Sequence, residues 1–116
     1  MKRNTAQLKE KLIQTGVEEI KKNGLDQLSL RTIAKNCGVT HGTPYRHFKS
    51  KEDYLRVVLT RLSTFLNQEI AQGIDQKVSA RDQLAQMGFN LITFTKRYPY
   101  FFEALFIKFP FKYMKI

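Results

Sequence analysis

Residues 29–51 read SLRTIAKNCGVTHGTPYRHFKSK, and this stretch decides the fold of the amino-terminal half. Ser29 favours the start of a helix, because its hydroxyl can accept a hydrogen bond from a free backbone N–H group. The small and apolar residues after it recur at the spacing of one helical face: Leu30, Ile33, Ala34 and Cys37. Gly38 ends that helix, and Thr40 can cap a second short helix that reaches Phe48. Two short helices joined by a glycine-containing turn form the helix-turn-helix pattern.

The predicted helix over residues 40–48 has an apolar side and a polar side. At about 100° per residue, Pro44 and Phe48 share one side, which we assign to the core. The remaining residues are distributed as follows: Gly42, Thr43 and Arg46 on the opposite side, and Tyr45 and His47 on the two flanks. Pro44 removes only the first hydrogen bond of this helix, so we expect its first turn to survive with a slight distortion.

A helix of this kind suits the major groove of DNA. The side opposite Pro44 and Phe48 would face the base edges, and the residues on the two flanks would reach the phosphates. Gly42 lets the backbone approach the bases closely, and Arg46 can donate to guanine or to a phosphate. His41, near the amino terminus of the helix, can meet base edges. Lys51 lies in the first turn of the next helix, where backbone N–H groups support an anion contact. Two alternatives remain: Tyr45 could pack on the apolar side, and Arg46 could be an ordinary solvated charge.

Positive charge is concentrated in the same half of the chain. The 116 residues have a formal net charge of +10 and a pI of about 9.9. Residues 1–51 carry eleven Lys and Arg against four Asp and Glu, whereas residues 52–116 carry nine against six. This excess favours a polyanionic partner. A hydrophobic fraction of 42% and a charged fraction of 26% are typical of a globular protein rather than of a disordered tail.

The whole chain reads as helices separated by short polar joints, without the alternating pattern of strands, so we expect an all-α fold. Asn4 or Thr5 can cap a first helix, which Gly24 ends. Ser50 begins a long helix whose apolar pattern is lost near Gly73.

Ser79 begins a further helix before Pro99, and its apolar face is predicted to hold Leu84, Met87, Leu91, Ile92 and Thr95. Ten of the fourteen aromatic residues lie between positions 89 and 113. A place in a core explains them better than a ligand cage does. Left uncovered, such an apolar surface would cause self-association.

Several other classes of site are disfavoured. Cys37 is the only cysteine, so the chain has no internal disulfide, and we expect a small buried residue there rather than a nucleophile. His41 and His47 could form a metal pair, but two histidines alone rarely make a site. No phosphate-binding loop, nucleophile elbow or apolar carboxylate pair is present, so we expect neither an enzyme nor a cofactor. With no export signal and no run of about 18 apolar residues, a cytoplasmic protein without a membrane role is expected.

The run GVTHGTPYRHF over residues 38–48, followed by KSKEDYL over residues 49–55, resembles the recognition signature of the TetR/AcrR (tetracycline-repressor) family. The upstream LSLRTIA, residues 28–34, is similar to the second helix of that family. The resemblance covers about residues 5–66. It implies a three-helix DNA-binding head joined to a helical regulatory region, with the boundary between residues 49 and 50: a head over 1–49 and a regulatory region over 50–116.

The resemblance also implies which residues contact DNA. Those expected near bases are Thr40, His41 and Gly42. Those expected at phosphates are Ser29, Thr32, Thr43, Tyr45, His47 and Lys51. Position 44, which is often Leu in the family, is Pro here.

The family implies in addition a repressor that binds double-stranded operator DNA as a homodimer and responds to a small effector. The aromatic segment suggests that this effector is apolar. Candidate lining residues of an effector pocket are Phe65, Phe89, Leu91, Phe94, Tyr98 and Phe102. A bound effector would move the helix that begins at Ser50 and change the separation of the two recognition helices, whose half-sites lie about 34–36 Å apart. The chain is shorter than is usual for the family, so it is either a fragment or a short member.

Two other functions fit the sequence. The chain could be a non-specific nucleic-acid binder driven by the net charge of +7 in residues 1–51. It could also be a helical partner-binding module built on the aromatic segment. An Arg46→Ala substitution separates the first alternative from a sequence reader, because a reader would lose specificity whereas a phosphate binder would weaken evenly.

Overall fold

The computed structural model describes residues 5–110 of the chain. In chain order its elements are α1 (Thr5–Asn23), the 3-10 turn η1 (Leu25–Gln27), α2 (Leu30–Asn36), the 3-10 turn η2 (Thr43–Arg46), α3 (Lys51–Ala71), α4 (Ala80–Arg97), α5 (Pro99–Glu103) and the π-helical turn η3 (Ala104–Lys108). The described residues contain no strand, so the prediction of an all-α fold is confirmed.

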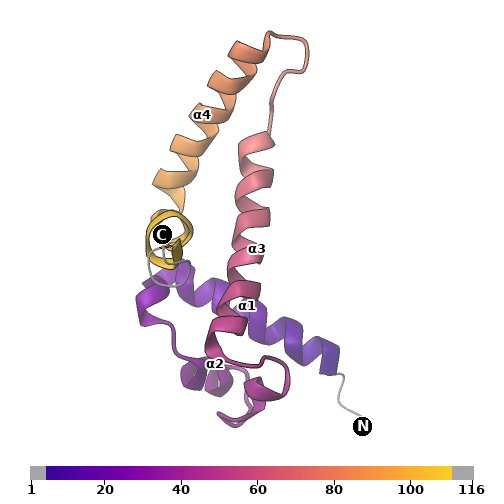
Figure 1. Cartoon of the computed structure of the whole chain (residues 1–116), viewed down its shortest axis with the longest axis vertical. Helices are drawn as coiled ribbons and strands as arrows, with labels where there is room; N and C mark the ends of the chain where they lie inside the picture. Colours follow the sequence, from indigo (N-terminus) through magenta and orange to yellow (C-terminus); the bar gives the residue numbers. More distant parts are fainter. Residues whose placement is uncertain (1–4, 111–116) are drawn as a thin grey trace.

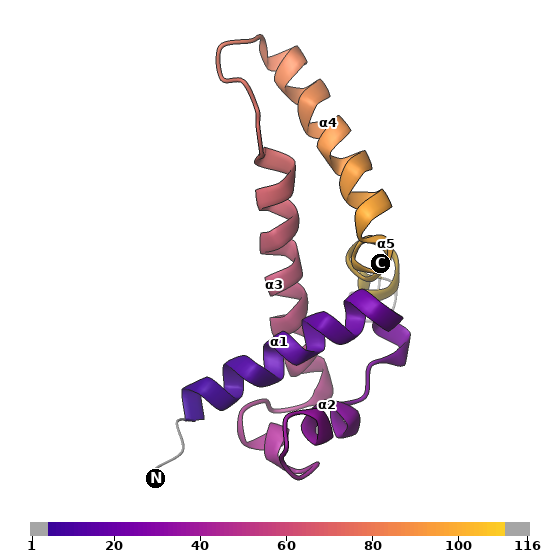
Figure 2. The same cartoon turned by 180° about the vertical axis from the view of Figure 1, so that it is seen from behind.

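α3 runs through the centre of the molecule, and the other elements are arranged around it (Figure 1). α1 crosses the lower part of α3, and α4 folds back beside α3 after the connection over residues 72–79. α5 packs against α1, and η3 contacts both η1 and α3, as the view from behind also shows (Figure 2). α2 and the turn that follows it lie at the end of the molecule farthest from the α3–α4 connection.

Three serine residues start helices, as the sequence predicts. The hydroxyls of Ser29, Ser50 and Ser79 accept hydrogen bonds at 3.4, 3.1 and 3.1 Å from the backbone N–H three residues further on. The Asp53 carboxylate also reaches back, and it accepts a hydrogen bond from the Lys49 N–H at 3.0 Å. These bonds satisfy N–H groups that have no partner inside the helix, and so they fix where α2, α3 and α4 begin.

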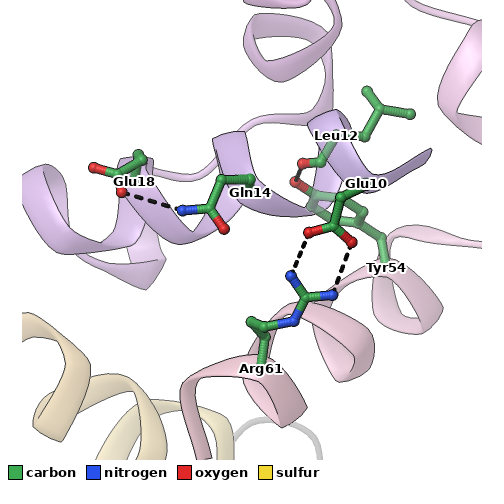
Figure 3. Close-up of polar contacts among 6 residues, drawn as sticks. All are labelled: Glu10, Leu12, Gln14, Glu18, Tyr54 and Arg61. Carbon is green, nitrogen blue, oxygen red and sulfur yellow. Dashed lines mark hydrogen bonds and ion pairs between the residues drawn. The ribbon is translucent and has the colours of Figure 1, made fainter. Parts of the chain in front are cut away.

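A close contact between α1 and α3 holds the amino-terminal half against the long helix (Figure 3). The side chain of Tyr54 is fully buried, and its hydroxyl donates a hydrogen bond to the Leu12 carbonyl at 2.7 Å. Burial raises the pKa of the Tyr54 phenol. Gly16 makes this approach possible, because a Cβ atom there would overlap the Tyr54 hydroxyl.

At the rim of this contact, Arg61 on α3 donates two hydrogen bonds to the carboxylate of Glu10 on α1, at 2.6 and 2.9 Å (Figure 3). Hydrogen bonding from Arg61 lowers the pKa of Glu10. Both side chains are about half exposed, so the pair orients the two helices more than it stabilises them.

The predicted apolar face of α4 is largely uncovered, whereas two of the aromatic residues for which a core role is predicted, Phe94 and Phe101, are buried. Leu84, Met87 and Ile92 are 68%, 39% and 58% exposed. Phe94, a residue left out of that face, is the buried residue of α4. The periodicity of the sequence identifies apolar side chains that lie on the same face of α4. In the structure, α4 packs against α3 along a narrow strip and also contacts α5. Neither contact covers Leu84, Met87 or Ile92 among residues 5–110. No helix in that part of the chain is long and apolar enough to span a membrane.

Candidate nucleic-acid interface

The turn after α2 has the geometry that the helix-turn-helix pattern requires. Gly38 adopts a positive φ of 75°, and Val39 N donates to the Ala34 carbonyl at 3.0 Å. Ala34 is completely buried, and Val39 packs against the core, so the two arms of the turn lie close together. Cys37 is also buried, with its sulfur 3.3 Å from the Thr15 hydroxyl. It is therefore a small buried residue, as predicted.

The next segment differs from the prediction of an α-helix over residues 40–48, because it forms the short 3-10 turn η2 (Thr43–Arg46). Pro44 explains the difference. In an α-helix starting at Thr40, residue 44 would donate to the Thr40 carbonyl, and proline has no N–H to do so. That carbonyl instead accepts a hydrogen bond from Thr43 N at 3.0 Å. The expectation that the first α-helical turn survives Pro44 was wrong.

The same three-residue spacing continues along the segment. Tyr45 N donates to the Gly42 carbonyl at 3.2 Å, and His47 N donates to the Pro44 carbonyl at 3.0 Å. The Phe48 N–H shares the Pro44 carbonyl at 3.0 Å, and this is the four-residue bond at the end of the segment. Within residues 40–48, Thr43–Arg46 thus form a 3-10 turn, which is narrower and longer per residue than an α-helix, and turns flank it on both sides.

The division into a buried and an open side is confirmed. Pro44 and Phe48 are buried in the head, and Gly42 and Arg46 are exposed. Tyr45 is 53% exposed, so most of its ring faces solvent rather than the apolar side. The remaining residues predicted to contact DNA divide into exposed ones, Thr32, Thr40, His41 and Lys51, and half-buried ones, Ser29, Thr43 and His47. The structure places all ten on α2, η2, the turns beside them and the start of α3, at the lower end of Figure 1.

Residues 29–51 contain cations and no acidic residue. The cations, all exposed, are Arg31, Lys35, Arg46, Lys49 and Lys51. The ion pairs within residues 5–110 lie elsewhere, on Arg56, Arg61 and Lys108. Asp53 lies nearby, but its carboxylate accepts from the Lys49 N–H rather than pairing with a cation of this stretch, so the charged side chains can meet phosphates.

Sequence reasoning missed one cation beside this surface. The ammonium of Lys9, on α1, lies 5.6 Å from the centre of the Phe48 ring. Lys9 is exposed, and it adds charge next to η2. Only the packing of α1 across the head brings these two residues together, so no local motif could have indicated it.

Among residues 5–110 no three His, Cys, Asp or Glu side chains come close enough together to hold a metal ion. His41 is exposed in the turn, and His47 is half-buried at the end of η2.

The candidate effector residues do not line a single cavity. Phe65 and Tyr98 line a cavity of about 340 Å³ between α1, α3 and the start of α5, together with Phe101. The Phe65 ring lies 5.1 Å from Tyr98 and 6.1 Å from Phe101, centre to centre, with both pairs edge to face. Phe94 lies behind this group and is 2% exposed, so it belongs to the core.

The other three candidates lie apart from this cavity. Leu91 and Phe102 are half-buried, and Phe102 contacts Phe106 with ring centres 4.9 Å apart. Phe89 is 69% exposed on α4 and borders a separate open depression beside Gly73. The structure therefore brings together Phe65, Phe94 and Tyr98.

Comparison with known proteins agrees with this geometry. Residues 12–58 match the family model described as bacterial regulatory proteins, tetR family. The chain is 35% identical over 74 residues to the fatty acid metabolism regulator protein of Bacillus subtilis, a match that covers 64% of this chain and 38% of that protein. It is 46% identical over 46 residues to an HTH-type transcriptional regulator of Staphylococcus aureus, covering 39% of this chain and 25% of the other. The chain thus spans well under half the length of these relatives.

Solved structures share the fold. A TetR-family transcriptional regulator of Haemophilus influenzae has a TM-score of 0.62 and 25% identity, and the match covers 90% of this chain and 57% of that one. A putative TetR-family regulator of Vibrio parahaemolyticus has a TM-score of 0.64 at 22% identity, covering 75% and 49%. All of these proteins are named as regulators and none as an enzyme. Sequence, relatives and fold agree over the head, where residues 12–58 match the tetR family of bacterial regulatory proteins.

Proposed function

We propose that this chain is a sequence-specific DNA-binding transcriptional regulator that reads double-stranded operator DNA through residues 29–51. The observation that carries the proposal is the arrangement of that stretch. Its apolar residues Pro44 and Phe48 are buried, and its five Lys and Arg side chains are exposed, with no ion pair described for any of them. This is the surface that a major groove and its flanking phosphates require.

Each group has a role in this proposal. Arg46 donates to a guanine edge, and the absence of a side chain at Gly42 lets the backbone approach the bases. Thr40 and His41 lie near the bases at the entrance of the segment. The phosphate contacts come from Ser29, Thr32, Thr43, Tyr45, His47 and Lys51, and Lys51 acts beside the first N–H groups of α3.

The regulatory part of the proposal follows from the similarity of the head to the tetR family. We assign residues 1–49 to the DNA-binding head and residues 50–116 to the regulatory region, with α3 connecting the two. The protein acts in the cytoplasm as a homodimeric repressor, and a small apolar effector moves α3 and so changes the spacing of two heads. The cavity presents the rings of Phe65, Tyr98 and Phe101 to the apolar part of such an effector, beside charged side chains that include Glu18, Lys21 and Arg61.

The test is selection of bound sequences from a random DNA pool, with the mass of the protein measured in solution. The proposal predicts a palindromic consensus whose half-sites lie about 34–36 Å apart. A single half-site would remove the dimer from the proposal, and the absence of any enriched sequence would refute specific recognition. Arg46→Ala should relax the preference at one base pair of each half-site, whereas Lys96→Ala on α4 should leave the consensus unchanged.

Two observations favour other functions, and the same measurements separate them. The lack of acidic residues in 29–51 also suits a non-specific nucleic-acid binder, which would bind scrambled duplexes equally well and with the same salt dependence. The exposed apolar residues Leu84, Phe89 and Ile92 suit a partner-binding module. Such a module would bind no DNA and would be a monomer until its partner was added.

A further inference from the structure

We propose that the cavity between α1, α3 and the start of α5 binds a small organic anion, an apolar ring system that carries a carboxylate, and that Lys21 meets its charge. The inference rests on the regulatory function proposed above, and it names the charge and the size of the effector. The cavity has a volume of about 340 Å³, near the lower end of the range of about 300–1,000 Å³ for ligand sites, which suits a molecule of one or two rings.

The cavity lies between the DNA-binding head and the regulatory region. α1 belongs to the head, and four of its residues line the cavity: Gln14, Val17, Glu18 and Lys21. The same helix packs against α2, where the DNA-reading stretch of residues 29–51 begins. A ligand in this cavity therefore touches the head directly, rather than acting on it only through α3.

The more buried lining residues form an apolar floor. The Phe65 ring meets Tyr98 and Phe101 edge to face, and the rings of Tyr98 and Phe101 are stacked with their centres 5.4 Å apart. Val17 and Leu62 add aliphatic side chains that are buried in the core. Aromatic rings pack well on such a floor, in offset-stacked or edge-to-face contact. The floor therefore favours a ring system as the apolar part of the ligand.

Three charged side chains line the cavity, and two of them already have partners (Figure 3). Arg61 donates two hydrogen bonds to the Glu10 carboxylate, at 2.6 and 2.9 Å. Glu18 accepts a hydrogen bond from the Gln14 amide at 3.3 Å. The third is Lys21, whose ammonium takes no part in the ion pairs of residues 5–110. Among the lining residues, Lys21 is thus the cation that a ligand can pair with.

The Lys21 ammonium lies beside the aromatic floor. It is 5.8 Å from the centre of the Tyr98 ring, a distance at which a cation is attracted to a ring face. A carboxylate on a ring bound to the floor would accept a charge-assisted hydrogen bond from this ammonium. A cationic ligand would instead meet a like charge beside the same ring, with only Glu18 to offset it. The arrangement therefore favours an anion.

The experiment titrates the full chain at neutral pH with naphthalene-2-carboxylate, naphthalene-2-methanol and naphthalene-2-methanamine, followed by NMR of backbone amides and methyl groups. The three probes share one ring system and differ in charge. We expect the carboxylate to bind about fivefold more tightly than the alcohol, which is the upper end of the effect of an exposed ion pair. The ammonium probe should bind more weakly than both, and the shifts should centre on Val17, Phe65 and Phe101.

Two pairs of variants test the site. Lys21→Gln should remove the preference for the carboxylate and leave binding of the alcohol unchanged. Lys22→Gln, at the adjacent lysine of α1 that does not line the cavity, should change neither. Gln68→Trp should fill the cavity and block all three probes, whereas Asn67→Trp, exposed on the same helix outside the cavity, should not.

Three results would overturn the inference: no saturable shifts at the cavity, equal or tighter binding of the ammonium probe, or shifts centred on Leu84 and Ile92, the exposed apolar residues of α4. No DNA is present in this titration, so each of these results leaves the proposed DNA-binding function intact. A chain that binds the carboxylate as expected but selects no DNA sequence would overturn that function, and the effector role with it, while the cavity keeps its ligand.

Discussion

The contact between α1 and α3 makes Gly16→Ala the most informative stability test. A Cβ at this position would overlap the Tyr54 hydroxyl and would lie 3.0 Å from the Tyr54 Cζ and 3.1 Å from a Val58 methyl. Tyr54 is fully buried, so the ring has little room to retreat. Either the helices separate or the tyrosine leaves the Leu12 carbonyl, to which it donates at 2.7 Å.

The expected magnitude follows from three contributions. Overpacking costs about 1–3 kcal/mol. Losing the hydrogen bond of a buried hydroxyl costs about 1–3 kcal/mol. Alanine regains about 1 kcal/mol over glycine inside a helix such as α1. The free energy of unfolding should therefore fall by about 3 kcal/mol, and the Tm by about 4–8 °C for each kcal/mol.

The assay is urea and thermal unfolding followed by circular dichroism. Gly88→Ala is the matched control, because Gly88 lies inside α4 with no atom near its would-be Cβ. It should raise stability by about 0.8–1.0 kcal/mol. Combining Gly16→Ala with Tyr54→Phe removes the clashing oxygen, so the two changes together should cost less than the sum of each alone. If Gly16→Ala were as harmless as Gly88→Ala, the packing described for α1 and α3 would be refuted.

Three further predictions concern other contacts. Ser50→Ala should lower the free energy of unfolding by about 1 kcal/mol at an unchanged urea m-value, and Ser50→Thr should restore most of it, because the cap of α3 depends on the hydroxyl; equal stability of both variants would contradict this. Glu10→Gln should flatten the acid limb of stability. The pKa of Glu10 is lowered by Arg61, so its contribution is complete above the unfolded value of about 4.3 and is lost as pH falls through the folded one; identical pH profiles in low salt would contradict it. Lys51→Ala should reduce the salt slope of DNA binding by about one, because one phosphate contact is lost, whereas Lys96→Ala should not change that slope.

Local signals in the sequence predicted the starts of α1, α2, α3 and α4, but not η1, α5 or η3. The caps at Ser29, Ser50 and Ser79 and the stop at Gly24 involve residues within a few positions of one another, so the sequence alone contains the information. Pro44 was also a local signal, because proline cannot donate a backbone hydrogen bond, but its effect on the helix was underestimated. Removing one hydrogen bond matters little in a long helix, whereas in this short segment it was the bond that would have nucleated the α-helix.

Long-range contacts could not be predicted in the same way. Tyr54 and Leu12 are 42 positions apart, and Arg61 and Glu10 are 51 apart, so only the packing of α1 on α3 brings each pair together. The exposed face of α4 illustrates a second limit. Spacing indicates that Leu84 shares a side with other apolar residues, but it does not indicate whether another element covers that side.

The candidate interface was largely predictable because it is contiguous. All ten predicted residues lie within positions 29–51, and the division between buried and open sides follows from local spacing. The effector cavity combines α1, α3 and α5, and Phe101 was missed because no short motif joins those elements.

The central proposal is that the open side of η2 and its neighbouring turns is the DNA-reading surface. The most direct measurement is an amide-resolved NMR titration of the labelled chain with its selected duplex, using a scrambled duplex of equal length for comparison. We expect the largest specific shifts to fall on residues 29–51, with Gly42 and Arg46 among them. Shifts centred on α4, or equal shifts with both duplexes, would contradict it.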